Sequence, residues 1–149
     1  MKKMLLVGLL SVGTGFLMGY LFLSEKNSLI KNWNRQEKYY FIEEGIYSSF
    51  DNLKNNLSSV RGKVIDFEDN KYYVYFGITK NQMIADKIQD IYQNKGYKVH
   101  IIEKYLTSEE FLQNVLQFDN LLIDKNEEEE ILTIESVVLA NYEEIIKKE

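Results

Sequence analysis

Few side chains in this chain of 149 residues could carry out catalysis or hold a metal ion. The chain has no Cys and a single His, His100, so disulfides, a cysteine nucleophile, thiolate zinc sites and multi-histidine metal sites are excluded. Glu43 and Glu44 are neighbours on an expected strand, so their carboxylates point to opposite faces and would not converge on one bond. Residues 127–130 are all Glu, which is typical of the solvated first turn of a helix. We therefore expect no enzyme activity, no metal and no cofactor.

Aromatic side chains offer a different chemistry, because the chain contains 11 Tyr and 8 Phe. If residues 72–78 form a strand, Tyr73 and Tyr75 point to one face of the sheet. The opposite face then carries Tyr72, Val74, Phe76 and Ile78. An aromatic ring can stack on the C–H face of a sugar, and hydroxyl and carboxylate groups can fix its orientation. The simpler interpretation is that the tyrosines form ordinary cross-strand pairs on a half-exposed sheet.

The strand that carries these tyrosines belongs to the second copy of an internal repeat. Residues 40–46 (YFIEEGI) are followed 32 positions later by residues 72–78 (YYVYFGI), and Tyr, Gly and Ile match. Each copy continues through a polar turn, a helix-like stretch and a second strand-like run. The repeat predicts an α+β domain over residues 39–106, with the order βαββαβ and helices on one face of a four-stranded sheet.

The same alternation of side chains assigns further residues to the face of the tyrosine pair. Counted back from the glycine, Phe41 and Glu43 of the first copy occupy the positions of Tyr73 and Tyr75. In the last strand, His100 points to this face as well, whereas Val99 and Ile101 point under the helices. We expect this face to be uncovered.

The amino-terminal segment is apolar enough to cross a membrane. Residues 4–23 contain no charge, and 20 residues are sufficient for a transmembrane helix. A cleaved signal peptide would need small residues after the apolar core, and residues 21–23 (LFL) provide none. We therefore predict an uncleaved anchor over residues 1–23 and a polar stalk over residues 24–38. Gly15 and Gly19 have the GxxxG spacing that permits close helix pairing, so a homodimer through the anchor is a further possibility.

Charge is distributed unevenly along the chain. Residues 1–38 carry 6 Lys or Arg and 2 Asp or Glu, residues 39–106 carry 9 of each, and residues 107–149 carry 3 and 12. Nucleic acid is therefore excluded as an expected ligand, since no segment beyond the anchor region has a basic excess. The orientation of the anchor stays open. The positive flank after it favours a cytoplasmic carboxyl-terminal portion, whereas the short positive tail before it favours the opposite.

Residues 107–149 are expected to form a helical hairpin. Residues 107–110 (TSEE) match a capping box, and residues 124–126 (DKN) separate two stretches with helical periodicity. The second stretch carries a wide apolar stripe: Ile131, Ile134, Val138, Tyr142 and Ile145, widened by Leu132, Leu139 and Ile146. We expect the hairpin to dock on the domain or to meet a partner protein.

The repeat resembles the SPOR domain (sporulation-related repeat). The resemblance rests on Tyr72 to Thr79 (YYVYFGIT), the following helix and Gly96 to Val99 (GYKV), with residues 40–48 matching the first half. It implies a bacterial envelope protein, active in cell division or sporulation, that binds the glycan strands of peptidoglycan stripped of stem peptides. It further implies that the domain lies outside the cytoplasm. The implied glycan-binding residues are Phe41, Glu43, Tyr73, Tyr75 and His100.

A second hypothesis keeps the fold and changes the function. Glu43 on the expected binding face, the acidic carboxyl-terminal region and its wide apolar stripe are also typical of a protein-interaction scaffold that no longer binds glycan. The two hypotheses differ in one structural expectation. Glycan binding on the sheet requires Tyr73 and Tyr75 to be exposed.

Overall fold

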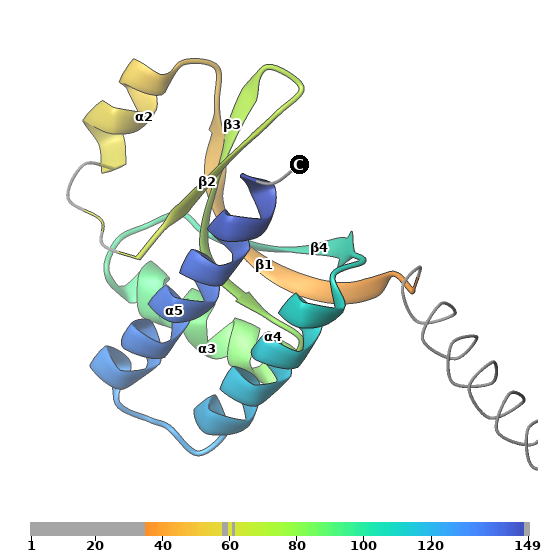
Figure 1. Cartoon of the computed structure of the whole chain (residues 1–149). Helices are drawn as coiled ribbons and strands as arrows, with labels where there is room; N and C mark the ends of the chain where they lie inside the picture. Colours follow the sequence, from red (N-terminus) through yellow and green to blue (C-terminus); the bar gives the residue numbers. More distant parts are fainter. Residues whose placement is uncertain (1–34, 58–59, 61, 148–149) are drawn as a thin grey trace, which may run out of the picture. The chain divides into compact units, whose positions relative to one another are not determined.

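The computed structural model describes residues 35–57, 60 and 62–147. The fold is α+β, with one four-stranded antiparallel sheet and four helices (Figure 1). The elements in order are β1 (Glu37–Tyr47), α2 (Phe50–Leu57), β2 (Val64–Glu68), β3 (Lys71–Thr79), α3 (Gln82–Asn94), β4 (His100–Leu106), α4 (Glu109–Leu122) and α5 (Glu128–Ile146). Residues Gln36–Glu149 make up one compact unit, so the repeat and the helical hairpin (α4 and α5) fold together. The predicted anchor and most of the predicted stalk lie outside the described residues, and no helix among those described is long and apolar enough to cross a membrane.

The sheet has the strand order β2-β3-β1-β4. The first strands of the two repeats, β1 and β3, therefore lie side by side at its centre, and the second strands, β2 and β4, form its edges. This is the split β-α-β arrangement that a duplicated strand-helix-strand unit produces. The predicted α+β class and the four-stranded sheet are confirmed.

One turn and two helix starts are formed by residue types that favour these conformations. Asp69 and Asn70 form the β2–β3 turn with φ values of 51° and 59°, a left-handed conformation that these residue types tolerate. The side chain of Asn81 accepts a hydrogen bond from Met83 N at 2.9 Å at the start of α3. The side chain of Ser108 likewise accepts from Phe111 N at 3.2 Å at the start of α4.

Two irregularities in the β1–β3 pairing change which side chains share a face. The register shifts between Ile42 and Glu43 and again before Gly45, so one extra residue bulges from each strand. As a result, Phe76 packs in the core beneath α3, whereas Ile78 packs with Phe41 on the opposite face. The prediction that Ile78 shares a face with Phe76 is therefore wrong.

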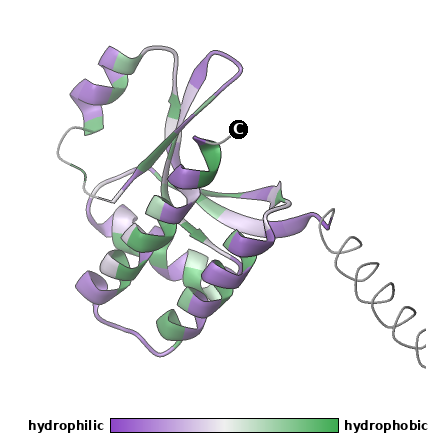
Figure 2. Ribbon diagram, viewed as in Figure 1, coloured by the Kyte–Doolittle hydropathy of each residue, from purple (hydrophilic) through white to green (hydrophobic). Residues whose placement is uncertain are grey.

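Helices cover both faces of the sheet. On the α3 face, Ile84, Ile88 and Tyr92 pack with Phe76. On the opposite face, which we call the hairpin face, the buried residues of the hairpin include Phe111, Val115, Val138, Leu139 and Tyr142. Figure 2 shows hydrophobic and hydrophilic residues alternating along both hairpin helices, as expected for helices with one buried side. The prediction of an uncovered sheet face is therefore wrong, because the apolar stripes of the hairpin are buried there.

Two buried acidic residues of the hairpin bind the end of β3. Strand β2 pairs with β3 only as far as Tyr75, so the last residues of β3 have no strand neighbour on that side. There Glu135 Oε2 accepts a hydrogen bond from Ile78 N at 3.1 Å. Asp119 accepts from Thr79 Oγ1 at 2.6 Å and from Lys80 N at 2.9 Å. These carboxylates take the place of a neighbouring strand.

Candidate functional site

The five residues predicted to bind glycan all belong to the hairpin face. Glu43 is paired with Tyr75 on one side and with His100 on the other, and directly opposed residues point the same way. Phe41 and Tyr75 lie within the core beneath the hairpin, and Tyr73 packs against that core. The alternation read from the sequence therefore grouped these side chains correctly on one face.

Their exposure differs from the expectation. Phe41 is 0 % exposed and Tyr75 is 1 % exposed, so neither ring offers a surface to a ligand in this structure. Tyr73 and Glu43 are half-buried, and only His100 is exposed. Burial raises the pKa of the Glu43 carboxyl above its ordinary value, while the charges of Lys104 and His100 oppose the shift. A role for these five residues in glycan binding stays a prediction.

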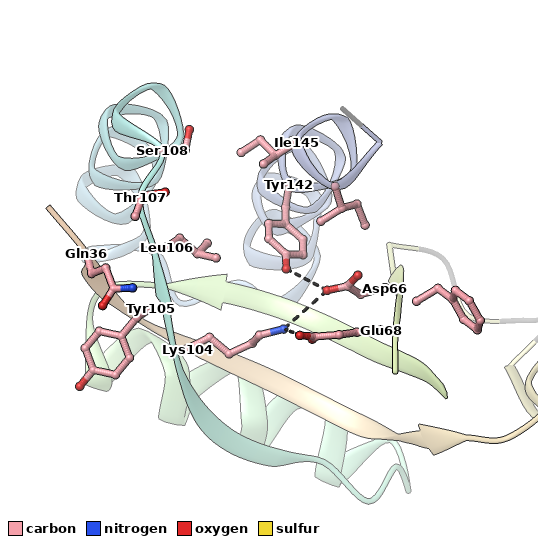
Figure 3. Close-up of a pocket in the computed structure, with 12 residues that line it drawn as sticks. Gln36, Asp66, Glu68, Lys104, Tyr105, Leu106, Thr107, Ser108, Tyr142 and Ile145 are labelled. Atoms are coloured by element: carbon pink, nitrogen blue, oxygen red, sulfur yellow. Dashed lines mark hydrogen bonds and ion pairs between the residues drawn. The ribbon is translucent and has the colours of Figure 1, made fainter. Parts of the chain in front are cut away.

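A groove remains open beside the hairpin, with a volume of about 550 Å³. Its walls come from β2, from β4 with the two residues that follow it, and from the last turns of α5 (Figure 3). Asp66, Glu68, Lys104 and Tyr142 place polar atoms on it, and Ile145 adds apolar surface. The ring of Tyr105 points away from the groove in Figure 3.

Lys104 lines the groove, and three aromatic rings of the hairpin face lie around its amine. Its Nζ donates to the Tyr75 hydroxyl at 3.1 Å and lies 5.1 Å from the centre of that ring. The centres of the Phe41 and Tyr73 rings lie at 5.5 Å and 5.9 Å, within the range of cation–π attraction. Three of the five predicted residues thus come together, but around a lysine of the same chain.

The same lysine connects the two edges of the sheet. Lys104 belongs to β4 and Asp66 to β2, and their charged atoms lie 3.5 Å apart although two strands separate them in the sheet. Asp66 also accepts a hydrogen bond from the Tyr142 hydroxyl at 3.1 Å, and Glu68 lies 3.8 Å from the lysine amine. Strand twist curls the sheet enough for the long side chain to span its concave face. Lys104, Asp66 and Tyr142 therefore fasten β4, β2 and α5 to one another.

The groove offers polar groups that could bind a ligand. Within residues 35–57, 60 and 62–147, no three side chains of the metal-binding types come together. Lys104 and Asp66 are engaged with each other and with tyrosine hydroxyls, whereas the carboxylate of Glu68 is 62 % exposed and free to meet solvent. A polar ligand in the groove would meet Glu68 and the backbone between Lys104 and Ser108.

Lys104, Asp66 and Tyr142 could not be recognised as a group from the sequence, because they come from three distant segments. One signal for Lys104 was present. It follows His100 by four positions in β4, so alternation places it on the same face as the five predicted residues.

No protein-family model matches the sequence, and no curated protein or solved structure is detectably similar. The SPOR resemblance therefore depends on the repeat in residues 39–106 alone.

Proposed function

We propose that this chain is a single-pass membrane protein of the bacterial cell envelope whose SPOR-like domain binds partner proteins instead of a glycan strand. The order βαββαβ, the strand order of the sheet and the internal repeat support a SPOR-like domain. The uncharged segment at residues 4–23 supports the membrane anchor.

The covered hairpin face is the observation that favours protein binding over glycan binding. A glycan strand could reach Phe41 and Tyr75 only if the hairpin left the sheet. That movement would expose the five buried hairpin residues Phe111, Val115, Val138, Leu139 and Tyr142. Exposing each would cost about 1.5 to 3 kcal/mol. Contacts of a glycan strand with the rings of Phe41 and Tyr75 would have to supply that whole total before any binding energy remained.

The groove around Lys104 supports a second candidate, in which a short glycan end binds beside the hairpin. Its lining is about half polar or charged, and such groups can form hydrogen bonds with the hydroxyls of a sugar. The candidate needs no movement of the hairpin and uses Glu68 and the backbone after Lys104.

Retention on cell-wall sacculi separates the two candidates. We expect the full-length chain, purified in mild detergent, to stay in the supernatant with both intact and amidase-treated sacculi. Retention that is lost in the Glu68→Ala variant would establish the groove candidate, and Asp90→Ala on the exposed surface of α3 provides the matched control. Retention that depends on Tyr73 and Tyr75 would overturn the proposal of a closed face.

The location outside the cytoplasm has its own test. A reporter enzyme that is active only outside the cell, fused after Glu149, should be active. Activity only of a cytoplasmic reporter at the same position would contradict an envelope function.

A further inference from the structure

Four aromatic residues form an exposed cluster on the α3 face, which we call the Tyr72 patch: Tyr47 of β1, Phe50 of α2, Phe67 of β2 and Tyr72 of β3. The strand register places Tyr47 and Phe67 directly opposite Tyr72 on its two neighbouring strands. The Tyr72 ring centre lies 4.7 Å from that of Phe67 and 5.8 Å from that of Phe50. Phe67 is 58 % exposed and Phe50 is 51 % exposed.

The patch is open because the helices cover this face unequally. Helix α3 packs over one end of the face, and the end that carries the Tyr72 patch is left to α2, a helix of 8 residues. Figure 1 shows α2 and the β2–β3 turn at the same end of the domain. Tyr47 and Tyr72 pack partly against the core, so the two exposed phenylalanines rest on a fixed base.

A fixed group of exposed rings is the kind of surface that proteins bind. Rigid aromatic side chains lose little conformational entropy on binding, and they dominate the energetics of protein interfaces. The ring of Phe67 packs with Tyr72 on the α3 face, whereas its neighbour Asp66 faces the groove, so Phe67 borders the groove while its ring belongs to the patch.

The charges around the Tyr72 patch indicate the charge of the side chains that a partner would present to it. Acidic residues at its rim are Glu44, which accepts a hydrogen bond from the Tyr47 hydroxyl at 2.7 Å, together with Asp51 and Asp69. The basic residue next to it in sequence is Lys54, because Lys71 is paired with Glu68 and both side chains point to the hairpin face. This acidic excess favours a partner with Lys or Arg beside its apolar side chains, and it disfavours a second copy of the same patch, whose acidic rim would be repelled.

We propose that the Tyr72 patch binds a partner protein through a segment in which an aromatic or aliphatic side chain is flanked by Lys or Arg. The proposal rests on the proposed function, since it names the surface through which the domain binds proteins. The apolar side chain packs on Phe50, Phe67 and Tyr72, and the basic residues pair with the acidic rim.

Selection from a peptide library tests the proposal with defined probes. Peptides displayed on phage are selected on the full-length chain in detergent, with a Phe50→Ser/Phe67→Ser chain present in excess as competitor. We expect enrichment of peptides with an aromatic or aliphatic residue flanked by Lys or Arg. Enrichment of acidic or purely polar peptides, or no enrichment over the competitor, would overturn the proposal.

Affinity measurements then locate the binding surface. A labelled selected peptide should bind the native chain with an affinity at least 10-fold higher than the Phe67→Ser chain, and Met83→Ser, which changes an equally exposed residue on α3, should leave binding unchanged. Peptide binding that is unaffected by Phe50→Ser and Phe67→Ser would contradict the Tyr72 patch as the binding surface. It would not contradict the proposal that the domain binds proteins. Retention of the chain on sacculi without any peptide binding would overturn the proposed function itself. Self-association that is lost in Phe67→Ser would identify a second copy as the occupant and would also overturn the proposal.

Discussion

Glu135 of α5 accepts a hydrogen bond from the backbone N–H of Ile78 at 3.1 Å, and this contact fastens the helical hairpin to the end of β3 that extends beyond its pairing with β2. The glutamate is 1 % exposed, and its second oxygen, Oε1, has no hydrogen-bond partner among the described residues. Burial, with a smaller contribution from the nearby carboxylate of Asp119, raises the pKa of Glu135 to about 8, while the hydrogen bond from Ile78 N opposes the shift. The hairpin is therefore held by a carboxyl group that stays protonated at neutral pH.

The raised pKa of Glu135 predicts a stability that depends on pH. The folded chain binds the proton more tightly than the unfolded chain, so the stabilisation is complete below the unfolded pKa of 4.5 and is lost as pH rises towards about 8. Burial also raises the pKa of Asp119, which acts in the same direction. Urea unfolding of the full chain at pH 5, 6, 7 and 8 should show a falling free energy of unfolding.

Glu135→Gln isolates this contribution. The amide oxygen keeps the hydrogen bond from Ile78 N and cannot ionise, so the variant should lose less stability than the native chain between pH 5 and pH 8. Glu143→Gln, at an exposed position on the same helix, should keep the native pH dependence. Parallel curves for the native and Glu135→Gln chains would contradict a raised pKa.

Asp119 should be needed for a stable end of β3. Asp119→Ala leaves the Thr79 hydroxyl and the Lys80 N–H without their acceptor, and unpaired groups of this kind cost about 1 to 3 kcal/mol each when buried. We expect a lower urea midpoint for Asp119→Ala and almost no change for Asp124→Ala, which is exposed after α4. Equal midpoints for the two variants would show that the contact does not stabilise the fold.

Tyr75 distinguishes a covered face from an open one. Tyr75→Ala should lower the free energy of unfolding by about 3 to 5 kcal/mol, because it leaves a cavity beneath α5 where the buried ring was. Tyr105→Ala, at a position that is 57 % exposed, should change stability by less than about 0.5 kcal/mol. A small effect of Tyr75→Ala in thermal or urea unfolding would indicate that the ring is accessible, as glycan binding on the sheet requires.

Lys104 and Asp66 should be energetically coupled. Lys104→Met keeps the aliphatic stem but leaves Asp66 with the Tyr142 hydroxyl and without its cation. In a double-mutant cycle with Asp66→Asn, we expect a coupling free energy above about 0.5 kcal/mol. The pair Lys98 and Asp90, both exposed, provides the control and should show additive effects.

Much of the fold could be predicted because its signals are local. The duplicated strand-helix-strand pattern specified the sheet, Asp69 and Asn70 specified the turn between its halves, and Asn81 specified the start of α3. The capping-box pattern at residues 107–110 indicated the start of α4, where the cap is Ser108 and not Thr107. Each of these features depends on residues within a few positions of one another.

The covered face could not be predicted from the same signals, because it depends on where a distant hairpin docks. Alternation placed Tyr73 and Tyr75 on one face, but an amphipathic tyrosine suits both a buried and an exposed position. One indication was present in residues 72–78, which contain no charged residue. Continuous apolar runs are typical of strands that are covered on both faces. The bulges that move Ile78 to the hairpin face arise from strand pairing and leave no comparable pattern.

Cysteine labelling tests the docking of the hairpin most directly, because the chain has no Cys of its own and a single introduced thiol has no background. Val115 of α4 is 0 % exposed, on the side of the hairpin that packs against the sheet, and the next residue, Leu116, is 39 % exposed. In the full chain without denaturant, the thiol of Val115→Cys should react with a maleimide at least 100-fold more slowly than that of Leu116→Cys, and the two rates should converge in urea. Equal rates without denaturant would mean that the hairpin does not cover the sheet, and the face would be open to a glycan after all.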